Sequence, residues 1–533
     1  MKNLTLLLTL IFAMTAYVPA TAQEHTPGPA AKAEFDKARA LPFGDKGAVT
    51  LYRKAIDLDP DFYEAHQYYI MSFPSSAASL SADGEKKAAR ERARKELEDL
   101  YQCWAKDHPD KAVYQWALGW LCDYENPDKA VEYYKQAIKI DPRYAPAYDM
   151  LGISAEEHGD LELSRDYERK AHESWPNNIT FWRHYAGSWV DADLNKAREL
   201  AMQMAEKFPE EGARMLGYVA SRSTDESQTR EIYETLRRKF PKAGNTLVPL
   251  FNIYLKTDRT KALMLADEMV KNDTSSKDWP LLREYVQTLI HAEPLIGQGR
   301  ATELIVALDK IKLPRYGANR TALDLMRARA LDASGQTEKA YADLASTFAK
   351  TPSDEMRSAL IAYGKKLGKD AKHVEDDIWA QRSASAKPGM PFSLVSYATG
   401  KPVSLDDYKG RVVLVNFWYP KCGPCRGEFP YMQAALEKYK NQGFEILAIN
   451  GHSPEDEWVM PLIKGWKLGF VPLKGTDDVI DTYKVKGFPS NFLYGPDGRI
   501  YPMPSQVRPV TLREFELQVE ALLAQAKSMA KAQ

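Results

Sequence analysis

The chain has 533 residues, too many for a single hydrophobic core, so two or more domains are expected. Its 72 basic and 73 acidic residues nearly cancel, which argues against nucleic-acid binding and against attachment to an acidic membrane surface. A hydrophobic content of 44% suits soluble, globular material.

Residues 1–22 have the pattern of a secretory signal peptide. Lys2 precedes an apolar run from Leu4 to Ala16, and Ala20-Thr21-Ala22 forms a small-x-small cleavage site. The run is too short to span a bilayer comfortably, and an uncleaved N-terminal anchor is the alternative. The sequence therefore predicts export, with the periplasm as the expected compartment.

Residues 23–382 are rich in helix formers, and prolines that end helices recur from Pro109 to Pro241 with a period near 34 residues, the period of tetratricopeptide arrays. One spacing of small, aromatic and proline residues occurs twice, as Ala48, Tyr52, Ala55 and Pro60 and again as Ala130, Tyr134, Ala137 and Pro142. Small residues let paired helices approach, and the proline stops the second helix. The chain resembles the tetratricopeptide family, strongly over residues 44–210 and more weakly over 210–280, with degenerate units after that. In this family, helix pairs stack into a solenoid.

Two functions remain open for this array. Its concave surface could bind a peptide or a partner protein, as solenoids do. Alternatively, the array is a scaffold that positions or dimerises the domain attached to it.

Two of the four cysteines, Cys103 and Cys122, fall on consecutive predicted helices that flank Pro109. Across an antiparallel pair they would be offset by roughly 10 Å along the helix axes. A disulfide needs Cα atoms within about 7 Å. We therefore expect two buried, non-bonded thiols, with a structural disulfide as the alternative.

Residues 383–389 are expected to form a small-residue linker, followed by a compact domain over 390–533. The predicted elements, in order, are strands at 392–395, 403–405 and 412–417, a helix at 425–440, a strand at 444–449, a helix at 478–483, a strand at 491–494, a hairpin turn at 496–499 and a helix at 512–527. This alternation indicates an α/β sheet sandwiched by helices.

The buried strand at 412–417 leads to Cys422-Gly423-Pro424-Cys425 at the start of the next helix. Free N–H groups at a helix N-terminus stabilise a thiolate, so Cys422 is the expected nucleophile and Cys425 its partner. Pro424 lies in the first turn, where its missing donor costs little. A structural zinc site would need two further ligands at close spacing, and the sequence offers none nearby. No metal and no cofactor is predicted.

The run Phe417-Trp418-x3-Cys-Gly-Pro-Cys resembles thioredoxin. The longer pattern, from Asn416 through Arg426 and Glu428 to Pro430, resembles the TlpA/ResA branch of exported thiol–disulfide oxidoreductases, over roughly residues 388–525. This resemblance implies a thioredoxin fold and a redox-active disulfide between Cys422 and Cys425. It also implies a cis peptide bond before Pro489 and a substrate surface formed by Trp418, Gly423, Pro424, Phe488 and Pro489.

Proton transfer to and from Cys425 needs a nearby base. Thioredoxins carry a buried Asp on the preceding strand, but Asn416 stands there in this chain and cannot take a proton. The TlpA/ResA branch has an acid three residues after the second cysteine, which implies that Glu428 is the proton acceptor. The alternative is an ordinary first-turn glutamate that stabilises the helix N-terminus. Lys421 departs from the aromatic residue common before the first cysteine, and its charge is expected to favour the Cys422 thiolate.

These features together predict a tetratricopeptide-like solenoid followed by a thioredoxin-fold domain. The expected function is reduction of disulfides in exported client proteins, with electrons from a membrane thiol donor, as the resemblance implies. Two alternatives stand beside it. One is a non-enzymatic interaction protein with a vestigial thioredoxin domain. The other is a peroxiredoxin-type peroxidase, but such enzymes have Thr-x-x-Cys where this chain has Tyr419 three residues before Cys422.

Overall fold

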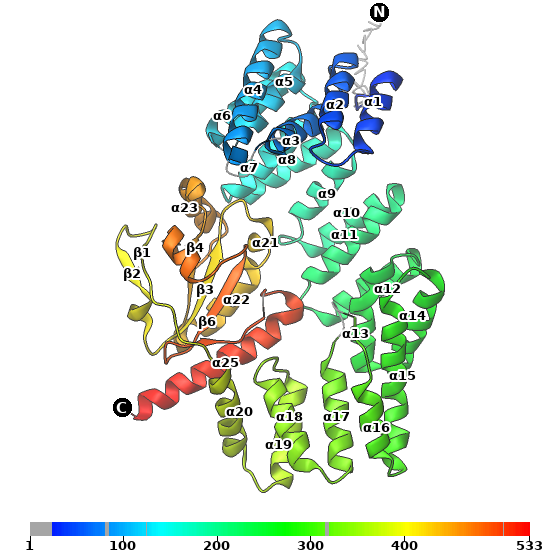
Figure 1. Ribbon diagram of the computed structural model, residues 1–533, viewed down its shortest axis with the longest axis vertical. Coiled ribbons are helices and arrows are strands. Elements are labelled where there is room, and N and C mark those ends of the chain that lie inside the picture. Colours follow the sequence, from blue (N-terminus) through cyan, green and yellow to red (C-terminus); the bar gives the residue numbers. More distant parts are fainter. Residues whose placement is uncertain are drawn as a thin grey trace, which may run out of the picture. The chain divides into compact units, whose positions relative to one another are not determined.

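The computed structural model describes residues 24–79, 81, 85–123, 125–314, 319–504 and 506–532 (Figure 1). The expected signal peptide, residues 1–22, lies outside this part of the chain. Among the residues described, no helix combines the length and apolar character needed to cross a membrane. The chain divides into two compact units, residues 1–150 with 169–181 and residues 151–168 with 182–533. Each unit is described by itself.

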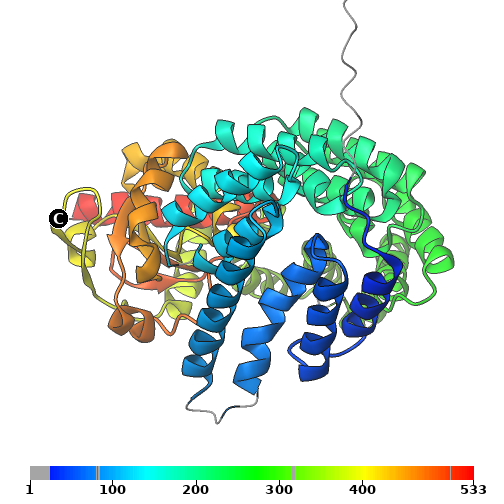
Figure 2. The same cartoon turned by 90° about the horizontal axis from the view of Figure 1, so that it is seen from above.

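Helices joined by short turns make up the described residues of the first unit. Its helices are α1 (Pro29–Arg39), α2 (Lys46–Leu58), α3 (Tyr63–Ser79), α4 (Lys86–Asp107), α5 (Ala112–Cys122) and α6 (Pro127–Ile140), together with parts of α7 (Ala145–Glu157), α8 (Leu161–Ser174) and α9 (Ile179–Ser188). Consecutive helices pack side by side, as the blue helices α1 to α4 show in Figures 1 and 2. This is the antiparallel pairing that the repeat predicts.

The repeated small and aromatic residues form the contacts between these helices. The side chains of Ala130, Tyr134 and Ala137 are all fully buried. Gly119 of α5 faces the Tyr134 ring so closely that a Cβ atom there would lie 2.5 Å from it. Asn126 begins α6 by accepting a hydrogen bond from the Lys129 amide at 3.0 Å. The repeat pattern therefore identified residues that set the distance between helices.

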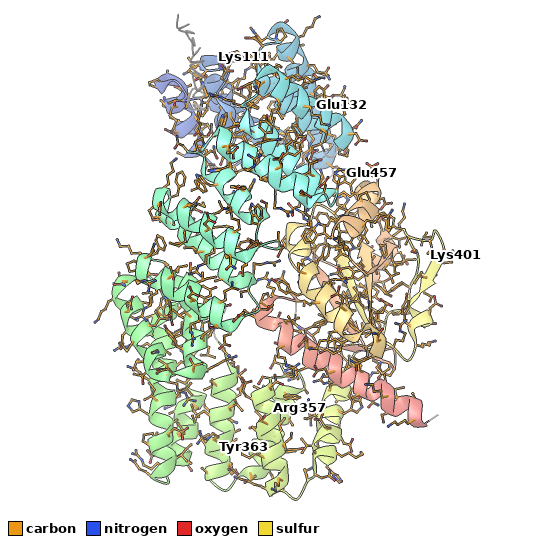
Figure 3. The ribbon with its side chains drawn as sticks, turned by 180° about the vertical axis from the view of Figure 1, so that it is seen from behind. Lys111, Glu132, Arg357, Tyr363, Lys401 and Glu457 are labelled. Atoms are coloured by element: carbon orange, nitrogen blue, oxygen red, sulfur yellow. A yellow bond between two sulfur atoms is a disulfide. The ribbon has the colours of Figure 1, made fainter. Side chains whose placement is uncertain are left out.

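The second unit continues the helical array and ends in a mixed α/β domain. Its further helices are α10 (Leu194–Lys207), α11 (Pro209–Arg222), α12 (Glu226–Lys239), η2 (Gly244–Leu247), α13 (Val248–Thr257), α14 (Arg259–Asn272), α15 (Asp278–Gly297), α16 (Ala301–Asp309), α17 (Thr321–Ala333), α18 (Thr337–Phe348), α19 (Asp354–Lys366) and α20 (Ala371–Ser385). Ion pairs join neighbouring helices, for example Arg357 of α19, labelled in Figure 3, with Glu375 of α20 at 2.6 Å.

The C-terminal domain is built on a five-stranded sheet in the order β5-β4-β3-β6-β7, beside a separate β1–β2 hairpin. The strands are β1 (Ser393–Val395), β2 (Pro402–Ser404), β3 (Val412–Trp418), β4 (Phe444–Asn450), β5 (Val471–Lys474), β6 (Ser490–Tyr494) and β7 (Ile500–Tyr501). The helices are η3 (Leu405–Tyr408), α21 (Gly423–Arg426), α22 (Phe429–Tyr439), η4 (Lys440–Gln442), η5 (Ser453–Glu455), α23 (Asp456–Gly465), α24 (Asp477–Thr482) and α25 (Pro509–Ala532). Strand β3 pairs in parallel with β4 and antiparallel with β6.

Both faces of this sheet are covered, and every residue of the central strand β3 is buried. One core joins Leu414 of β3 to Phe429 of α22 and Phe515 of α25. The other joins Val415 of β3 to Phe392 and Tyr483. A strand buried on both faces reads as a continuous apolar run, which explains why β3 was evident in the sequence. The helical array followed by a thioredoxin-like α/β domain confirms the expected fold class.

The helix expected over residues 425–440 is broken into α21 and α22 around Gly427 and Glu428. Pro430 lies at the start of α22 and has no N–H to continue the hydrogen bonds of α21. Strand β5 and helix α23 were missed altogether. Each contains a proline, Pro472 in the edge strand β5 and Pro461 inside α23, and these obscured the pattern.

The expected linker at 383–389 is packed against the sheet domain. Its first three residues form the last turn of α20, which ends at Ser385. Lys387 exchanges two backbone hydrogen bonds with Ile500, at 2.8 and 2.9 Å, and Arg499 donates to the Ala386 carbonyl at 2.8 Å. Hydrogen bonds to Arg499 and Ile500 therefore fix this segment against the sheet.

Cys103 and Cys122 lie on α4 and α5 and are not bonded to each other, as expected. Cys122 is buried, but Cys103 is exposed, so the expectation of two buried thiols is wrong for Cys103. Burial raises the pKa of Cys122 to about 11. We expect iodoacetamide to alkylate Cys103 in the native protein at about pH 8 and to leave Cys122 unmodified until the protein is unfolded. Peptide mass spectrometry would measure this, and equal labelling of both thiols would contradict it.

Candidate active site

The two remaining cysteines lie in the turn that follows β3. Cys422 is the N-cap residue of α21, and its sulfur forms a disulfide with Cys425, with Cα atoms 5.2 Å apart. The Cys425 amide donates to Cys422 Sγ at 3.2 Å. Both cysteines are buried, whereas Gly423 and Pro424 between them are exposed. The short helix therefore presents the dipeptide to solvent and covers the bridge.

The helix that follows Cys422 is a single turn, so the expected stabilisation of the thiolate by a long helix is wrong. A long helix beginning near Cys425 was expected to stabilise a thiolate through its dipole, but α21 spans only Gly423–Arg426. The dipole of one turn is small. The contact that can still stabilise a thiolate at Cys422 is the local hydrogen bond from the Cys425 amide to the Cys422 sulfur.

Glu428 lies one turn after Cys425, and its amide donates to the Cys425 carbonyl at 3.0 Å. Its side chain is 1% exposed. One carboxylate oxygen accepts from the Asn491 side chain at 2.9 Å and the other from the Val507 amide at 3.1 Å. Burial raises the pKa of Glu428 to about 7, although these two hydrogen bonds act to lower it. The group is thus balanced between its acid and base forms near neutral pH.

Asn416 and Asn491 form a buried polar chain that ends at Glu428. They are directly opposite each other on β3 and β6, and Asn416 Nδ2 donates to Asn491 Oδ1 at 2.7 Å. Asn491 Nδ2 then donates to Glu428. Sequence reasoning missed both Asn491 and the Val507 amide. The register of β6 against β3 would have identified Asn491, but nothing in the sequence indicates Val507.

We expect Asn491→Ala to move the pKa of Glu428 upward. The Asn491 amide stabilises the carboxylate form, so removing this donor leaves the effect of burial less opposed. The midpoint of the pH–rate profile for resolution of a mixed disulfide should therefore lie above that of the wild type. A midpoint at or below the wild-type value would contradict this assignment of the hydrogen bond.

The Phe488–Pro489 peptide bond is cis, as predicted. Phe488 is half-buried and packs edge-on against Tyr419, the residue directly after β3, with ring centroids 5.2 Å apart. Tyr419 precedes the cysteine turn, so this contact joins the proline loop to the turn. The structure thus brings Phe488 and Pro489 to the region of the cysteines that the sequence assigned to substrate.

Trp418 does not belong to this surface, so its expected role in substrate binding is wrong. Its side chain is fully buried and packs edge-on against Phe429, with ring centroids 5.2 Å apart. A tryptophan at the end of a strand buried on both faces points into the core. It stabilises the base of the cysteine turn and does not meet a substrate in this conformation.

Two stretches of the chain match known protein families. The AhpC/TSA family matches residues 387–503, and the tetratricopeptide repeat matches residues 125–144. The thiol–disulfide oxidoreductase ResA of Bacillus subtilis is 35% identical over 121 residues, which are 22% of this chain and 67% of the relative. This chain belongs to the ResA-like thiol–disulfide oxidoreductases.

Other relatives match the same region. ResA of Bacillus thuringiensis subsp. konkukian is 37% identical over 111 residues, 21% of this chain and 64% of the relative. Among solved structures, a putative thiol:disulfide interchange protein DsbE from Chlorobium tepidum is 29% identical, with a TM-score of 0.25, and covers 26% of this chain and 97% of its own. The chain thus spans about two thirds of the length of these ResA relatives, and the helical array lies outside the matched region.

The cation Lys421 of this ResA-like domain does not stand alone beside Cys422. Its ammonium lies 3.9 Å from a carboxylate oxygen of Glu157 and 4.2 Å from the centre of the Trp458 ring. Its backbone amide donates to Glu455 at 2.8 Å. The expected stabilisation of the Cys422 thiolate by Lys421 is therefore reduced, because an acid of the helical array offsets the charge.

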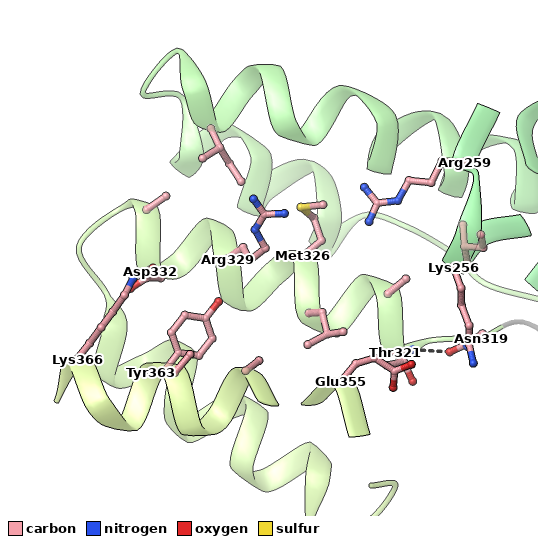
Figure 4. Close-up of a pocket in the computed structure, with 17 residues that line it drawn as sticks. Lys256, Arg259, Asn319, Thr321, Met326, Arg329, Asp332, Glu355, Tyr363 and Lys366 are labelled. Carbon is pink, nitrogen blue, oxygen red and sulfur yellow. Dashed lines mark hydrogen bonds and ion pairs between the residues drawn. The ribbon is translucent and has the colours of Figure 1, made fainter. Parts of the chain in front are cut away.

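A hollow of about 630 Å³ lies in the array of the second unit, among α13, α15, α17 and α19 (Figure 4). Its lining includes Met326 and Tyr363 together with the cations Lys256, Arg259, Arg329 and Lys366. Two of the cations are paired, Arg329 with Glu293 and Lys366 with Asp332. The hollow has the volume of a small ligand or of a few side chains.

Proposed function

We propose that this protein reduces disulfide bonds in exported client proteins through Cys422 and Cys425. The observation that carries the proposal is the pairing of the two cysteines in one exposed turn with Glu428, a buried carboxyl whose pKa is about 7, one turn further on. A group with that pKa can accept and return a proton near neutral pH. The family to which the chain belongs gives further support.

In the proposed reaction, the Cys422 thiolate attacks one sulfur of a client disulfide and expels the other as a thiolate, which takes up a proton. The client is now joined to Cys422 by a mixed disulfide. Glu428 accepts the proton of Cys425, and the Cys425 thiolate attacks the Cys422 sulfur. The second client thiolate leaves, and the Cys422–Cys425 bridge remains. Two electrons must then restore the dithiol, and we propose a membrane thiol donor as their source.

The surface offered to clients is proposed to consist of Gly423, Pro424, Phe488 and Pro489. The first two are exposed, and the latter two lie on the loop that contacts Tyr419. The Gly-Pro dipeptide between the cysteines is that of thioredoxin, whose potential is about −270 mV, and this supports reduction over oxidation.

The proposed function also includes export of the protein and binding of partners by its helical array. Residues 1–22 support export to the periplasm, where structural disulfides persist and a dithiol needs a supply of electrons. The helical array is proposed to bind clients or other proteins, and the hollow among α13, α15, α17 and α19 supports this role.

Cys425→Ser tests the proposal directly. Without the resolving thiol, Cys422 should accumulate mixed disulfides with clients in the exported fraction, and mass spectrometry after non-reducing purification would identify them. Cys103→Ser, which changes an exposed thiol elsewhere, serves as the matched control and should accumulate none. If Cys425→Ser forms no adduct and the wild-type protein cannot reduce insulin, the proposed function fails. A vestigial domain would give that result.

A further inference from the structure

Two acids from the helical array lie against the cations that flank the cysteine turn. Glu156 and Glu157 end helix α7 and belong to the second unit, as does the redox domain. Glu156 Oε1 lies 3.3 Å from Arg426 Nε, and Glu157 Oε2 lies 3.9 Å from Lys421 Nζ. One cation stands directly before Cys422 and the other directly after Cys425.

The two cations are held close to the turn. The Arg426 side chain is 10% exposed, and its Nη1 donates to the Pro420 carbonyl at 2.7 Å, so the guanidinium reaches back under the turn. The Lys421 side chain is 17% exposed and lies over the Trp458 ring. Neither charge extends into solvent, where water would screen it. Their effect on the cysteine sulfurs therefore depends on the acids that pair with them.

Further contacts fix this end of α7 against the redox domain. Gly159, just after α7, meets Gly465 at the end of α23 so closely that a Cβ atom on Gly465 would lie 2.2 Å from the Gly159 carbonyl oxygen. The His158 ring packs against Trp458 with centroids 5.5 Å apart. The two backbones can approach this closely only because both residues are glycines, so the contact is specific to this pair.

A second contact lies on the other side of the turn. Arg222 at the end of α11 donates to the Gly427 carbonyl at 2.5 Å, and its guanidinium lies 4.9 Å from the Tyr431 ring centre. Tyr431 returns a hydrogen bond to the Arg222 carbonyl at 2.8 Å. Arg222 is itself paired with Asp191 at 2.6 Å, so this contact brings little net charge. The acids on α7 differ from this contact because each of them offsets a cation that belongs to the turn itself.

A nearby cation stabilises a thiolate and lowers the thiol pKa, and a stabilised thiolate makes the reduced pair easier to form. An acid that neutralises the cation has the opposite effect. Other charged or titratable groups of the described chain that face this region include His158 and Tyr218 of the array, Glu428, Glu455, His452, Arg508 and Tyr431 of the redox domain, and the paired Arg222 and Asp191. These stay in place when the acids of α7 are replaced by amides.

We propose that Glu156 and Glu157 make the Cys422–Cys425 pair more reducing by neutralising Arg426 and Lys421. The helical array is then part of the redox centre as well as a surface for partners. This inference rests on the proposed function, because it concerns the potential of the same dithiol. Glu156 and Glu157 are positioning residues, since they act through the two cations and touch neither sulfur.

The test is a redox equilibrium of the full-length protein with glutathione. Two glutathione thiols reduce the bridge and leave as one glutathione disulfide, so the ratio of reduced to oxidised protein gives the equilibrium constant. We expect the double variant Glu156→Gln with Glu157→Gln to favour the reduced protein by about threefold to tenfold over the wild type. A tenfold change corresponds to about 30 mV. Glu162→Gln, which changes an exposed acid at the start of α8, is the matched control and should leave the constant unchanged.

Lys421→Gln separates an effect of charge from simple loosening of the contact. If charge is responsible, this variant should shift the equilibrium toward the oxidised protein, opposite to Glu157→Gln, and the protein carrying both changes should lie near the wild type. Shifts in the same direction for both single variants would overturn the inference, as would no shift in the Glu156→Gln, Glu157→Gln protein. A wild-type bridge that glutathione cannot reduce at all would instead count against the proposed function.

Discussion

Changing Cys422 to serine is expected to abolish disulfide reduction, lowering the rate by about three orders of magnitude or more. A serine hydroxyl stays protonated at neutral pH and is a poor nucleophile toward sulfur, so the first step of the proposed reaction cannot occur. Turnover of insulin with dithiothreitol as the electron source measures the rate. Circular dichroism would check that the domain remains folded, as expected because a serine is close in size to the cysteine it replaces.

The matched control for this variant is again Cys103→Ser, which should retain full activity. Substantial activity in the Cys422→Ser protein would mean that Cys425 can attack clients directly. That outcome would contradict the assignment of Cys422 as the nucleophile, which rests on its place at the N-cap of α21, since both thiols are buried, Cys422 at 3% and Cys425 at 0% exposed.

Glu428→Gln is expected to slow the resolution of the mixed disulfide by about a hundredfold at neutral pH, the usual contribution of a positioned base. In the wild type, the base is the carboxylate form, whose fraction increases as the pH rises through about 7. The rate of resolution should therefore rise with pH through that value. The glutamine variant has no titrating group at this position, so this rise should disappear. Stopped-flow fluorescence with a labelled client peptide would measure both.

The polar chain beside Glu428 indicates that the Glu428→Gln side chain can be accommodated. The new NH2 group would face one of the two N–H donors that now serve the carboxylate, but Asn491 can rotate its amide to present oxygen. Asn416 can turn in the same way and present Oδ1, a buried atom with no hydrogen-bond partner among the described residues. A misfolded variant would contradict this argument, and Asn491→Ala then offers a second way to change the same carboxyl.

Stability gives an independent check on the pKa of Glu428. Burial raises its pKa in the folded state to about 7 from the usual value of 4.5, so between these values the native state holds a proton that the unfolded state releases. As the pH rises through this interval, the stability of the wild type should fall, and that of the Glu428→Gln variant should fall less. Chemical denaturation at a series of pH values would measure this. Parallel curves for the two proteins would mean that the folded-state pKa is not raised.

The sequence predicted those features that depend on residues close together in the chain. The apolar run of β3, the cysteine spacing, the position of Glu428 and the proline loop each follow from residues close together in the chain. The repeat likewise placed Tyr134 in the core of the array. Trp418 was misassigned because a motif gives the identity of a residue without showing which way its side chain points.

The parts that could not be predicted depend on residues far apart in the sequence. Val507 reaches Glu428 only because the chain folds back before α25, and Glu157 reaches Lys421 only through the packing of α7 against the redox domain. The break between α21 and α22 had a local sign in Pro430, but its effect on the helix dipole became clear only from the bounds of α21.

The meeting of Gly159 and Gly465 has a practical consequence for this protein. A single methyl group on Gly465 would act as a wedge, because the helical backbone there tolerates alanine while the facing carbonyl leaves no room for it. The wedge would part α7 from the redox domain without removing a charge or a cysteine. A single methyl group at position 465 can therefore separate the helical array from the redox domain. In a related sequence, a residue bulkier than glycine at this position would indicate that α7 does not contact the redox domain in the same way.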